Sequence, residues 1–300
     1  MPTPAPTTIV LNGHSYEVKE QVGASSLTEV YRVEFEAGGP ADGPGKTVFD
    51  RLLDDDIWST SSALAHITLD PANNDLAANG AVMLGQLWPP GAAEEKFRRY
   101  LPRLLDHGTH AGRAIVLYPL YPGYVSMAEV KRSFPDGLDF RDVVWQWKRC
   151  LAALWYVHKE GLVCGGMTPN NLFVHPVEHG AKIMEWSYAA LTRGRIRAAD
   201  MSYADFLAPE ILRKLEAHPA TDLYMLAKSV LWMLGGDVKT DALPDRVPGP
   251  LADFLQGCLV KDRTARPNDA GKVHEDLDAL LLKVVGKPSY RRLVLPPPGV

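Results

Sequence analysis

Glycine, lysine and threonine occur together in one segment that could cradle a phosphate group. The segment Gly39-Pro-Ala-Asp-Gly-Pro-Gly-Lys-Thr47 follows an expected strand and ends in Gly45-Lys46-Thr47, as a phosphate-binding loop does. That loop needs another glycine five positions before Gly45, where this chain has Pro40. Proline lacks the backbone N–H that a phosphate nest uses, so the spacing argues against an NTPase of this type.

The cysteine content and the net charge argue against several classes of site and partner. The chain has three cysteines, no Cys-x-x-Cys pair and a formal net charge of −4, so neither a disulfide framework nor a zinc site is expected. A net negative charge gives no general attraction to nucleic acid or to an anionic membrane surface. No apolar run reaches the roughly 18 to 20 residues that span a bilayer. The start also lacks the basic and apolar parts of a signal peptide. We therefore expect a cytoplasmic protein with neither nucleic acid nor membrane as a partner.

The first 122 residues show the patterns of strands. Residues 16–22 and 29–35 alternate apolar and polar side chains around Gly23-Ala-Ser-Ser26, which predicts a β-hairpin. The apolar run 64–69 predicts a strand and leads through Pro71 into a helix at about 74–87. Residues 113–118 predict a further strand.

The second half changes to helical periodicity. Apolar residues from Phe140 to Leu154 fall at helical spacing and predict one long amphipathic helix ending near Gly161. Further helices are predicted at 222–234, 251–260 and 270–285. With 46% hydrophobic residues in 300, the chain can bury a large core. The predicted fold class is α+β. It comprises a flexible lead-in at 1–12, a strand-rich lobe at 13–122 with an irregular insertion at about 38–60, a helical lobe at 123–286 and an extended tail at 287–300.

Five landmarks in a fixed order carry a resemblance to a known family. They are Cys164-Gly165-Gly166 followed by Asn171, then Glu185-Trp186-Ser187, Ala208-Pro209-Glu210, Asp222, and Cys258-Leu-Val-Lys-Asp-Arg-Thr-Ala-Arg-Pro267. Over roughly residues 15–286 the chain resembles the eukaryotic-type Ser/Thr protein kinase family, in which these places hold His-Arg-Asp with a later Asn, Asp-Phe-Gly, Ala-Pro-Glu, a buried Asp and a late Arg. The resemblance implies a bilobal, protein-kinase-like fold.

The same resemblance implies roles for individual residues. Glu210 should pair with Arg266, and Asp222 should hold the backbone of the Cys164–Gly166 turn. These three residues are the structural candidates.

The first lobe matches the family pattern more loosely. Gly23 is the remaining glycine of the phosphate-covering hairpin, and Tyr118 joins it as a candidate nucleotide contact. His66 falls at the phosphate-binding lysine position and Gly80 at the position of that lysine's glutamate partner. For this strand and the helix after it, alignments to the family pattern that differ by one residue both remain open.

The catalytic positions have lost their chemistry. Phosphoryl transfer needs a Lys–Glu pair on the phosphates, metal ligands and a carboxylate that orients the attacking hydroxyl. His66 is short and mostly neutral at pH 7, given a reference pKa of about 6.5. Gly80 and Gly166 carry no functional group at all. We therefore expect a degenerate kinase, a pseudokinase without catalytic residues or a required cofactor, which binds a protein partner as a scaffold or allosteric regulator.

Several alternatives remain open at the level of sequence. Glu185 and Asn171 could together hold a hard cation, which would allow weak ATP and Mg²⁺ binding and make the chain a nucleotide-dependent transferase or an ATP sensor. A small-molecule phosphotransferase and an unrelated α+β domain rank lower. The arginines at 193, 195 and 197 form either a solvated basic loop or a docking patch for an acidic partner.

Overall fold

The computed structural model describes residues 6–35, 61–88, 99–287 and 289–296. The chain divides into two compact units. One comprises Met1–Trp88 and Pro102–Pro122, and the other comprises Pro89–Leu101 and Gly123–Val300. The predicted insertion at 38–60, and with it the Gly39–Thr47 segment, lies outside the described residues.

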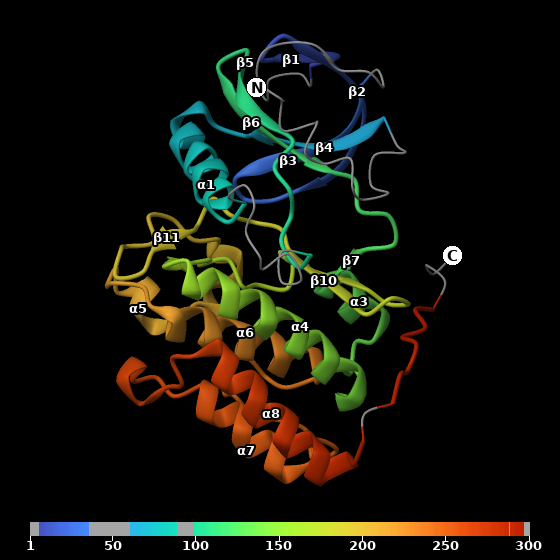
Figure 1. The fold of residues 1–300 in the computed structure, drawn as a ribbon, viewed down its shortest axis with the longest axis vertical. Coiled ribbons are helices and arrows are strands. Elements are labelled where there is room, and N and C mark those ends of the chain that lie inside the picture. The colour runs from blue at the N-terminus through green and yellow to red at the C-terminus, as the bar shows by residue number, and fades with distance from the viewer. Residues whose placement is uncertain (1–5, 36–60, 89–98, 288, 297–300) are drawn as a thin grey trace. The chain divides into compact units, whose positions relative to one another are not determined.

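The first unit is built on a six-stranded antiparallel sheet in the order β1-β2-β3-β4-β6-β5 (Figure 1). Its strands are β1 (Thr8–Leu11), β2 (His14–Ala24), β3 (Thr28–Glu34), β4 (Ser62–Thr68), β5 (Asp106–His110) and β6 (Arg113–Pro119). The predicted hairpin is confirmed as the antiparallel pair β2–β3. Along β4, Ala63, Ala65 and Ile67 are buried in the sheet's core while Leu64 and His66 alternate with them and are half-buried, as the two-residue period of a strand dictates.

Strand β1 corrects the prediction of a flexible lead-in at 1–12. Residues 8–11 pair with β2 through a tight turn at Asn12 and Gly13, whose φ values are 46° and 88°. Asn and Gly are the residues that such a turn favours. Ile9 and Leu11 are 0% and 2% exposed in the core of the sheet, so burial of two side chains stabilises a strand too short to show a clear sequence period.

Helix α1 (Asn74–Gln86) follows the short 3₁₀ turn η3 (Pro71–Asn73), as Pro71 predicted. The helix lies beside β6 (Figure 1). Its first residue is bonded to the β5–β6 hairpin, because the Asn74 side chain donates to Gly112 O at 2.8 Å and accepts from Ala114 N at 2.7 Å. These bonds fix where α1 begins relative to the sheet.

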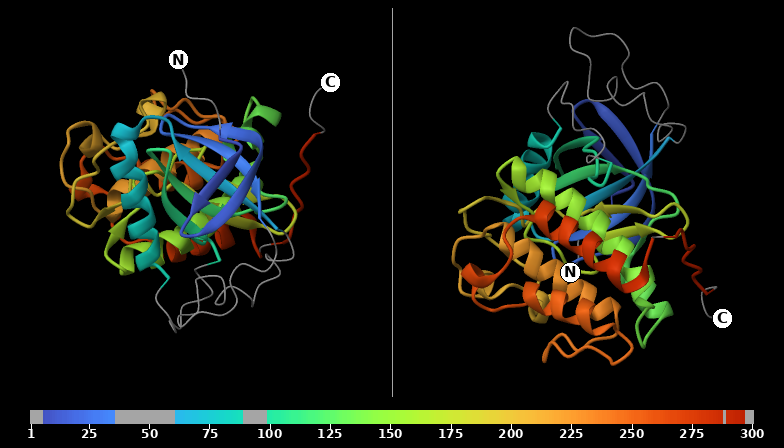
Figure 2. Two further views of the ribbon diagram at one scale, coloured as in Figure 1. Left: turned by 90° about the horizontal axis from the view of Figure 1, so that it is seen from above. Right: turned by 60° about the horizontal axis from the view of Figure 1, so that its bottom comes forward.

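The second unit is mainly helical. The α-helices among its described residues are α3 (Met127–Ser133), α4 (Phe140–Lys159), α5 (Pro209–Leu212), α6 (Pro219–Met233), α7 (Gly249–Cys258) and α8 (Ala270–Val285). The four predicted helices of this half are confirmed as α4, α6, α7 and α8. Helix α4 packs against α6 and α8, and Figure 2 shows α4 and α8 side by side. Among the described residues, no helix combines the length and apolar character required to cross a membrane.

Short strands frame the loop that contains Cys164 to Asn171. Strand β8 (Leu162–Val163) precedes this loop and pairs with β11 (Ala190–Leu191). Strand β9 (Leu172–His175) follows the loop and pairs with both β7 (Val125–Ser126) and β10 (Gly180–Ile183). The loop is therefore held at both ends by backbone pairing.

The described part of the C-terminal tail, residues 289–296, contains neither helix nor strand, yet it is bound to the second unit. Tyr290 Oη donates to Val177 O at 2.6 Å, and Leu293 N donates to Pro176 O at 3.2 Å. The side chain of Leu293 is 4% exposed. The His179 ring stacks on Trp145, with 4.1 Å between the ring centroids, and lies 4.8 Å from the Tyr290 ring. The tail is thus an extended segment fixed in place by specific contacts.

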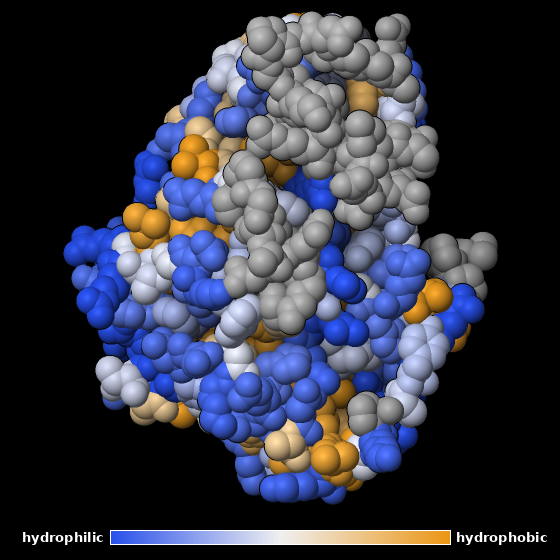
Figure 3. Space-filling model, viewed as in Figure 1, coloured by the Kyte–Doolittle hydropathy of each residue, from blue (hydrophilic) through white to orange (hydrophobic). Residues whose placement is uncertain are grey.

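The surface of the second unit is mostly hydrophilic on the face shown in Figure 3, with apolar residues gathered at its lower end over α7 and α8. Leu282 and Val285 of α8 are among the exposed apolar side chains, at 57% and 44%. Isolated exposed side chains of this kind are ordinary in folded proteins.

The pairing that the resemblance implied for Glu210 and Arg266 is present. Arg266 Nη2 lies 2.6 Å from Glu210 Oε2, and the two side chains are 4% and 0% exposed for Glu210 and Arg266 respectively. Glu210 also accepts from Thr221 Oγ1 at 2.8 Å, while Arg266 Nη1 donates to Ala220 O at 2.9 Å. The pair joins α5 and α6 to the segment before α8, and each charge has hydrogen-bond partners that offset its desolvation.

Removing one member of this pair should destabilise the fold strongly, because the other charge would remain buried and unpaired. Glu210→Ala or Arg266→Ala is expected to lower the free energy of unfolding by about 3–5 kcal/mol in chemical denaturation. The exposed pair of Lys272 and Asp276 on α8 provides the control, since solvent screens such a pair and Lys272→Ala should change stability far less. Similar losses from buried and exposed pairs would contradict the structural role of Glu210 and Arg266.

Candidate functional site

The carboxylate of Asp222 holds the turn at Cys164 and Gly165, as the resemblance implied. Asp222 Oδ2 accepts from Cys164 N and Asp222 Oδ1 from Gly165 N, both at 2.8 Å. The Nε2 atom of His158, near the end of α4, lies 2.9 Å from Asp222 Oδ2. Asp222 is 0% exposed, so the carboxylate is buried with these bonds directed at the turn and at α4.

The backbone at Gly165 suits only glycine. Its φ is +68°, in the left-handed region, and a Cβ atom there would lie 2.6 Å from Tyr188 O and 2.9 Å from Ile196 Cδ1. At Gly166 a Cβ would lie 3.1 Å from Glu185 O, closer than ordinary van der Waals contact. The positions where the resemblance places an arginine and a catalytic carboxylate are therefore packed around glycine.

Asn171 closes the loop that follows this turn. Its Nδ2 atom donates to Gly166 O and to Thr168 Oγ1, both at 3.0 Å. Its backbone carbonyl accepts from Met184 N at 2.9 Å, next to β10. The side-chain amide is therefore used to stabilise the loop, which is a common role of asparagine in irregular backbone.

Glu185 is buried, with 8% of its surface exposed, and bonds locally. Its Oε1 atom accepts from Ser187 N at 2.7 Å. Burial raises the pKa of Glu185, and the hydrogen bonds from Ser187 and Trp186 oppose that rise only in part. A raised pKa makes the carboxyl a poorer ligand for a hard cation. Within the described residues, no three His, Cys, Asp or Glu side chains are grouped as metal ligands.

In the first unit, His66 lies on β4 beside Tyr118, with 4.9 Å between the ring centroids and an edge-to-face geometry. Burial lowers the pKa of His66 to about 4, so the imidazole is neutral at pH 7. Gly80 lies on the buried face of α1, together with Leu76, Ala77, Ala81 and Leu84. Neither position supplies a charge.

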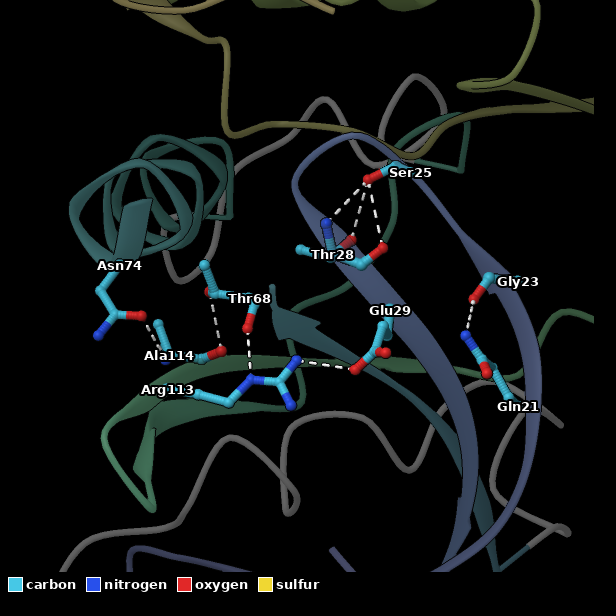
Figure 4. A network of polar contacts seen from close by, with 9 residues as sticks. All are labelled: Gln21, Gly23, Ser25, Thr28, Glu29, Thr68, Asn74, Arg113 and Ala114. Atoms are coloured by element: carbon cyan, nitrogen blue, oxygen red, sulfur yellow. Dashed lines mark hydrogen bonds and ion pairs between the residues drawn. The ribbon is translucent and has the colours of Figure 1, made fainter. Parts of the chain in front are cut away.

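The hairpin turn between β2 and β3 satisfies its own backbone donors (Figure 4). Ser25 Oγ accepts from Leu27 N at 3.1 Å and from Thr28 N at 3.0 Å, while Ser25 N donates to Thr28 O at 2.7 Å. Gly23, before this turn, accepts at its carbonyl from Gln21 Nε2 at 3.4 Å. The N–H groups of Leu27 and Thr28 thus donate to a serine hydroxyl. This contact was not predicted from the sequence.

A buried arginine in the first unit was also missed. Arg113 Nη2 donates to Glu29 Oε2 at 2.8 Å, and Arg113 Nε donates to Thr68 O at 2.5 Å (Figure 4). This guanidinium joins β6 to β3 and to the end of β4. Its charge is matched by Glu29, and its separation of 84 residues from that partner left no sequence pattern to detect.

Comparisons with known proteins identify the fold. No family model matches the chain, and no curated protein matches its sequence. Solved structures do match. The kinase domain of Mycobacterium tuberculosis PknI, in a mutant form, aligns with a TM-score of 0.63 and 17% identity over 93% of this chain and 99% of that chain.

The fold is that of a protein kinase. A second structure of the PknI kinase domain has a TM-score of 0.60 and 16% identity over 93% of this chain and 100% of that one. A further kinase domain has a TM-score of 0.65 and 12% identity over 92% and 98%. At identities this low, the structural match establishes the kinase fold alone. Activity has to be argued from the site.

The glycine pair in the kinase-fold turn can be tested by substitution. Gly165→Ala should lower the free energy of unfolding through its positive φ, by about 1–2 kcal/mol, and through the collision with Tyr188 O, by a further 1–3 kcal/mol or so. Gly161 has a similar φ of +76°, and a Cβ there would meet nothing within 4 Å, so Gly161→Ala measures the backbone strain alone. Equal losses in urea denaturation would contradict the tight packing at Gly165.

The half-buried imidazole of His66 predicts a pH dependence of stability, because its desolvation lowers the pKa. The pKa of His66 is about 4 in the folded chain against about 6.5 when unfolded, so the unfolded state binds more protons below pH 6.5. The free energy of unfolding should therefore fall as pH decreases from 6.5 to 4, by up to about 1.4 kcal/mol per pH unit from this group. His66→Gln should remove that part of the slope. The exposed His107 on β5 supplies the control His107→Gln, and an unchanged slope in His66→Gln would show that the ring is not buried as described.

Proposed function

We propose that this kinase-fold domain does not transfer phosphate and instead works by binding a protein, as a scaffold or allosteric regulator. The observation that carries the proposal is the turn at Gly165 and Gly166. Its backbone is held by Asp222 as a kinase-like loop, but its two central positions are packed against Tyr188 O, Ile196 and Glu185 O. The carboxylate that would orient a substrate hydroxyl is missing there, and any side chain at Gly166 would first require Glu185 O to shift, because a Cβ would lie 3.1 Å from it.

Loss of the catalytic carboxylate alone would lower the rate strongly, and other catalytic groups are missing as well. General acid–base groups typically contribute 10²–10⁴-fold to a rate, and phosphoryl transfer further depends on charges placed around the phosphates. His66 is neutral at pH 7 and Gly80 has no side chain, so the ion pair that would hold the phosphates is missing at both positions.

Retention of the structural contacts supports a binding role. The bonds of Asp222 and the buried pair of Glu210 and Arg266 stabilise the second unit, although the chemistry they would support is gone. A protein partner fits a net charge of −4 better than nucleic acid does. The three cysteines are free and buried, consistent with our proposal of a reducing, cytoplasmic location.

A second candidate is an ATP sensor or a nucleotide-dependent transferase. It is favoured by the placement of Glu185 and Asn171 around one point, since a Cβ on Gly166 would lie 3.1 Å from Glu185 O and 3.5 Å from Asn171 Nδ2. If their side chains turned toward a cation, they would supply carboxylate and amide oxygens, the ligands that Mg²⁺ accepts. Their present hydrogen bonds would first have to break.

Thermal unfolding with excess ATP, with and without Mg²⁺ or Mn²⁺, separates the two candidates. A ligand at about 100 times its dissociation constant adds roughly 2.7 kcal/mol to stability. We expect no shift of the unfolding temperature and no phosphate transfer to a general protein substrate.

The control is the double variant Asn171→Ala/Glu185→Gln. A metal-dependent shift in the natural chain that disappears in this variant would establish the nucleotide sensor. Phosphate transfer that disappears in the same way would overturn the proposal of a catalytically silent domain.

A further inference from the structure

The segment after β11 presents arginines at alternate positions. Arg193, Arg195 and Arg197 are exposed, whereas Thr192, Gly194 and Ile196 between them are half-buried. Ile196 points inward, because its side chain lies 2.9 Å from where a Cβ on Gly165 would be. Residues 191–194 form a turn in which Gly194 N donates to Leu191 O at 2.7 Å, so Arg193 is presented from this turn and Arg195 from the chain that follows it.

Backbone hydrogen bonds fix this segment to the chain before α6. Arg193 N donates to Ala217 O, and Ala217 N donates to Gly194 O, both at 2.8 Å. Thr192 N donates to Gly161 O at 2.8 Å. The φ of Arg193 is +67°, a conformation that arginine adopts only when its surroundings enforce it. The backbone that carries the arginines is therefore ordered before a partner binds.

The segment that runs alongside adds cations and apolar side chains. Arg213 and Lys214 are exposed, and Leu212 and Leu215 on either side of them are 51% and 53% exposed. Leu191, at the end of β11, is 55% exposed. We call these residues the Arg/Leu surface: Leu191, Arg193, Arg195, Leu212, Arg213, Lys214 and Leu215.

Charge and hydropathy on this surface point to one kind of partner. The Arg/Leu surface carries four cations, with the neighbouring Glu216 as a carboxylate, in a chain whose net charge is −4. Figure 3 shows strongly hydrophilic atoms at the left edge of the second unit, over the loop that follows β11. Cations alone would suit any polyanion. Exposed leucines beside them favour a peptide, which can supply apolar side chains as well as carboxylates.

We propose that the Arg/Leu surface binds an acidic, extended segment of a protein partner. Carboxylates of that segment face Arg193 and Arg195, and apolar side chains contact Leu212 and Leu215. The inference rests on the proposed binding function and names its surface and the chemistry of its partner. Arg suits this role because its planar guanidinium binds carboxylates in a bidentate manner.

The test uses a fluorescein-labelled 12-residue peptide that contains glutamate at alternate positions with leucines between, titrated with the full chain and followed by fluorescence anisotropy. We expect binding that weakens at least tenfold between 50 and 300 mM salt, because surface charges are screened. Arg193→Glu/Arg195→Glu should weaken binding at least tenfold. The matched control Lys283→Glu/Arg292→Glu changes the net charge equally at exposed sites elsewhere and should change affinity less than twofold.

A test variant and a control variant examine the apolar contacts. Leu212→Ser/Leu215→Ser should weaken binding at least threefold, whereas Leu282→Ser on α8, which is 57% exposed, should have no effect. Equal unfolding temperatures establish that each variant is folded, and a charge-reversal variant that fails this check is replaced by Arg193→Gln/Arg195→Gln.

Several outcomes would overturn the proposal. Absence of peptide binding at 100 µM chain, or equal weakening by both charge-reversal pairs, would show that the surface is not a specific site. Tighter binding of single-stranded DNA than of the peptide would assign a phosphate polyanion instead. The outcome is independent of catalysis, since measured phosphate transfer would overturn the silent-kinase function while leaving the anisotropy results unchanged.

Discussion

The rest of the second unit depends on the buried carboxylate of Asp222. A carboxylate with no solvent exposure is costly unless its oxygens are hydrogen-bonded, and Asp222 meets that requirement through two backbone N–H groups of the turn and the ring of His158. One side chain at the start of α6 thereby fixes both the end of α4 and the conformation of residues 164 and 165. The positive φ of Gly165 follows from this attachment, because the turn must present two successive N–H groups to the same carboxylate.

A glycine-lined turn changes what packs around it. With no side chain at Gly165, Tyr188 O and the side chain of Ile196 occupy the adjacent space. Ile196 is half-buried against this turn, whereas Arg193 and Arg195 before it are exposed. The exposed arginines at 193 and 195 therefore belong to the segment that packs against this turn.

The sequence predicted the elements whose pattern is long and regular. Helices α4 and α8 span 20 and 16 residues, enough for the 3.6-residue period to be unambiguous. The β2–β3 hairpin alternates only in part, since residues 19–24 of β2 are all exposed. The two-residue strands β8 and β11 carry no detectable period and form only because the chain brings them together. For the site, the resemblance located the turn, Asn171 and Glu185, but not what fills the space around glycine. Ser25 and Arg113 were missed because their roles arise from a local side-chain cap and a contact between distant strands.

In the first unit, the positions where the resemblance places nucleotide contacts make local contacts of their own. The hairpin turn directs two of its N–H groups at Ser25 Oγ, so a phosphate would have to compete with bonds that the ligand-free chain already makes. The buried guanidinium of Arg113 is neutralised by Glu29 and is not free to replace the missing lysine. A carboxylate introduced at Gly80 would lie among Leu76, Ala77, Ala81 and Leu84, where desolvation would favour its neutral form. Restoring a single residue would therefore leave the other obstacles in place.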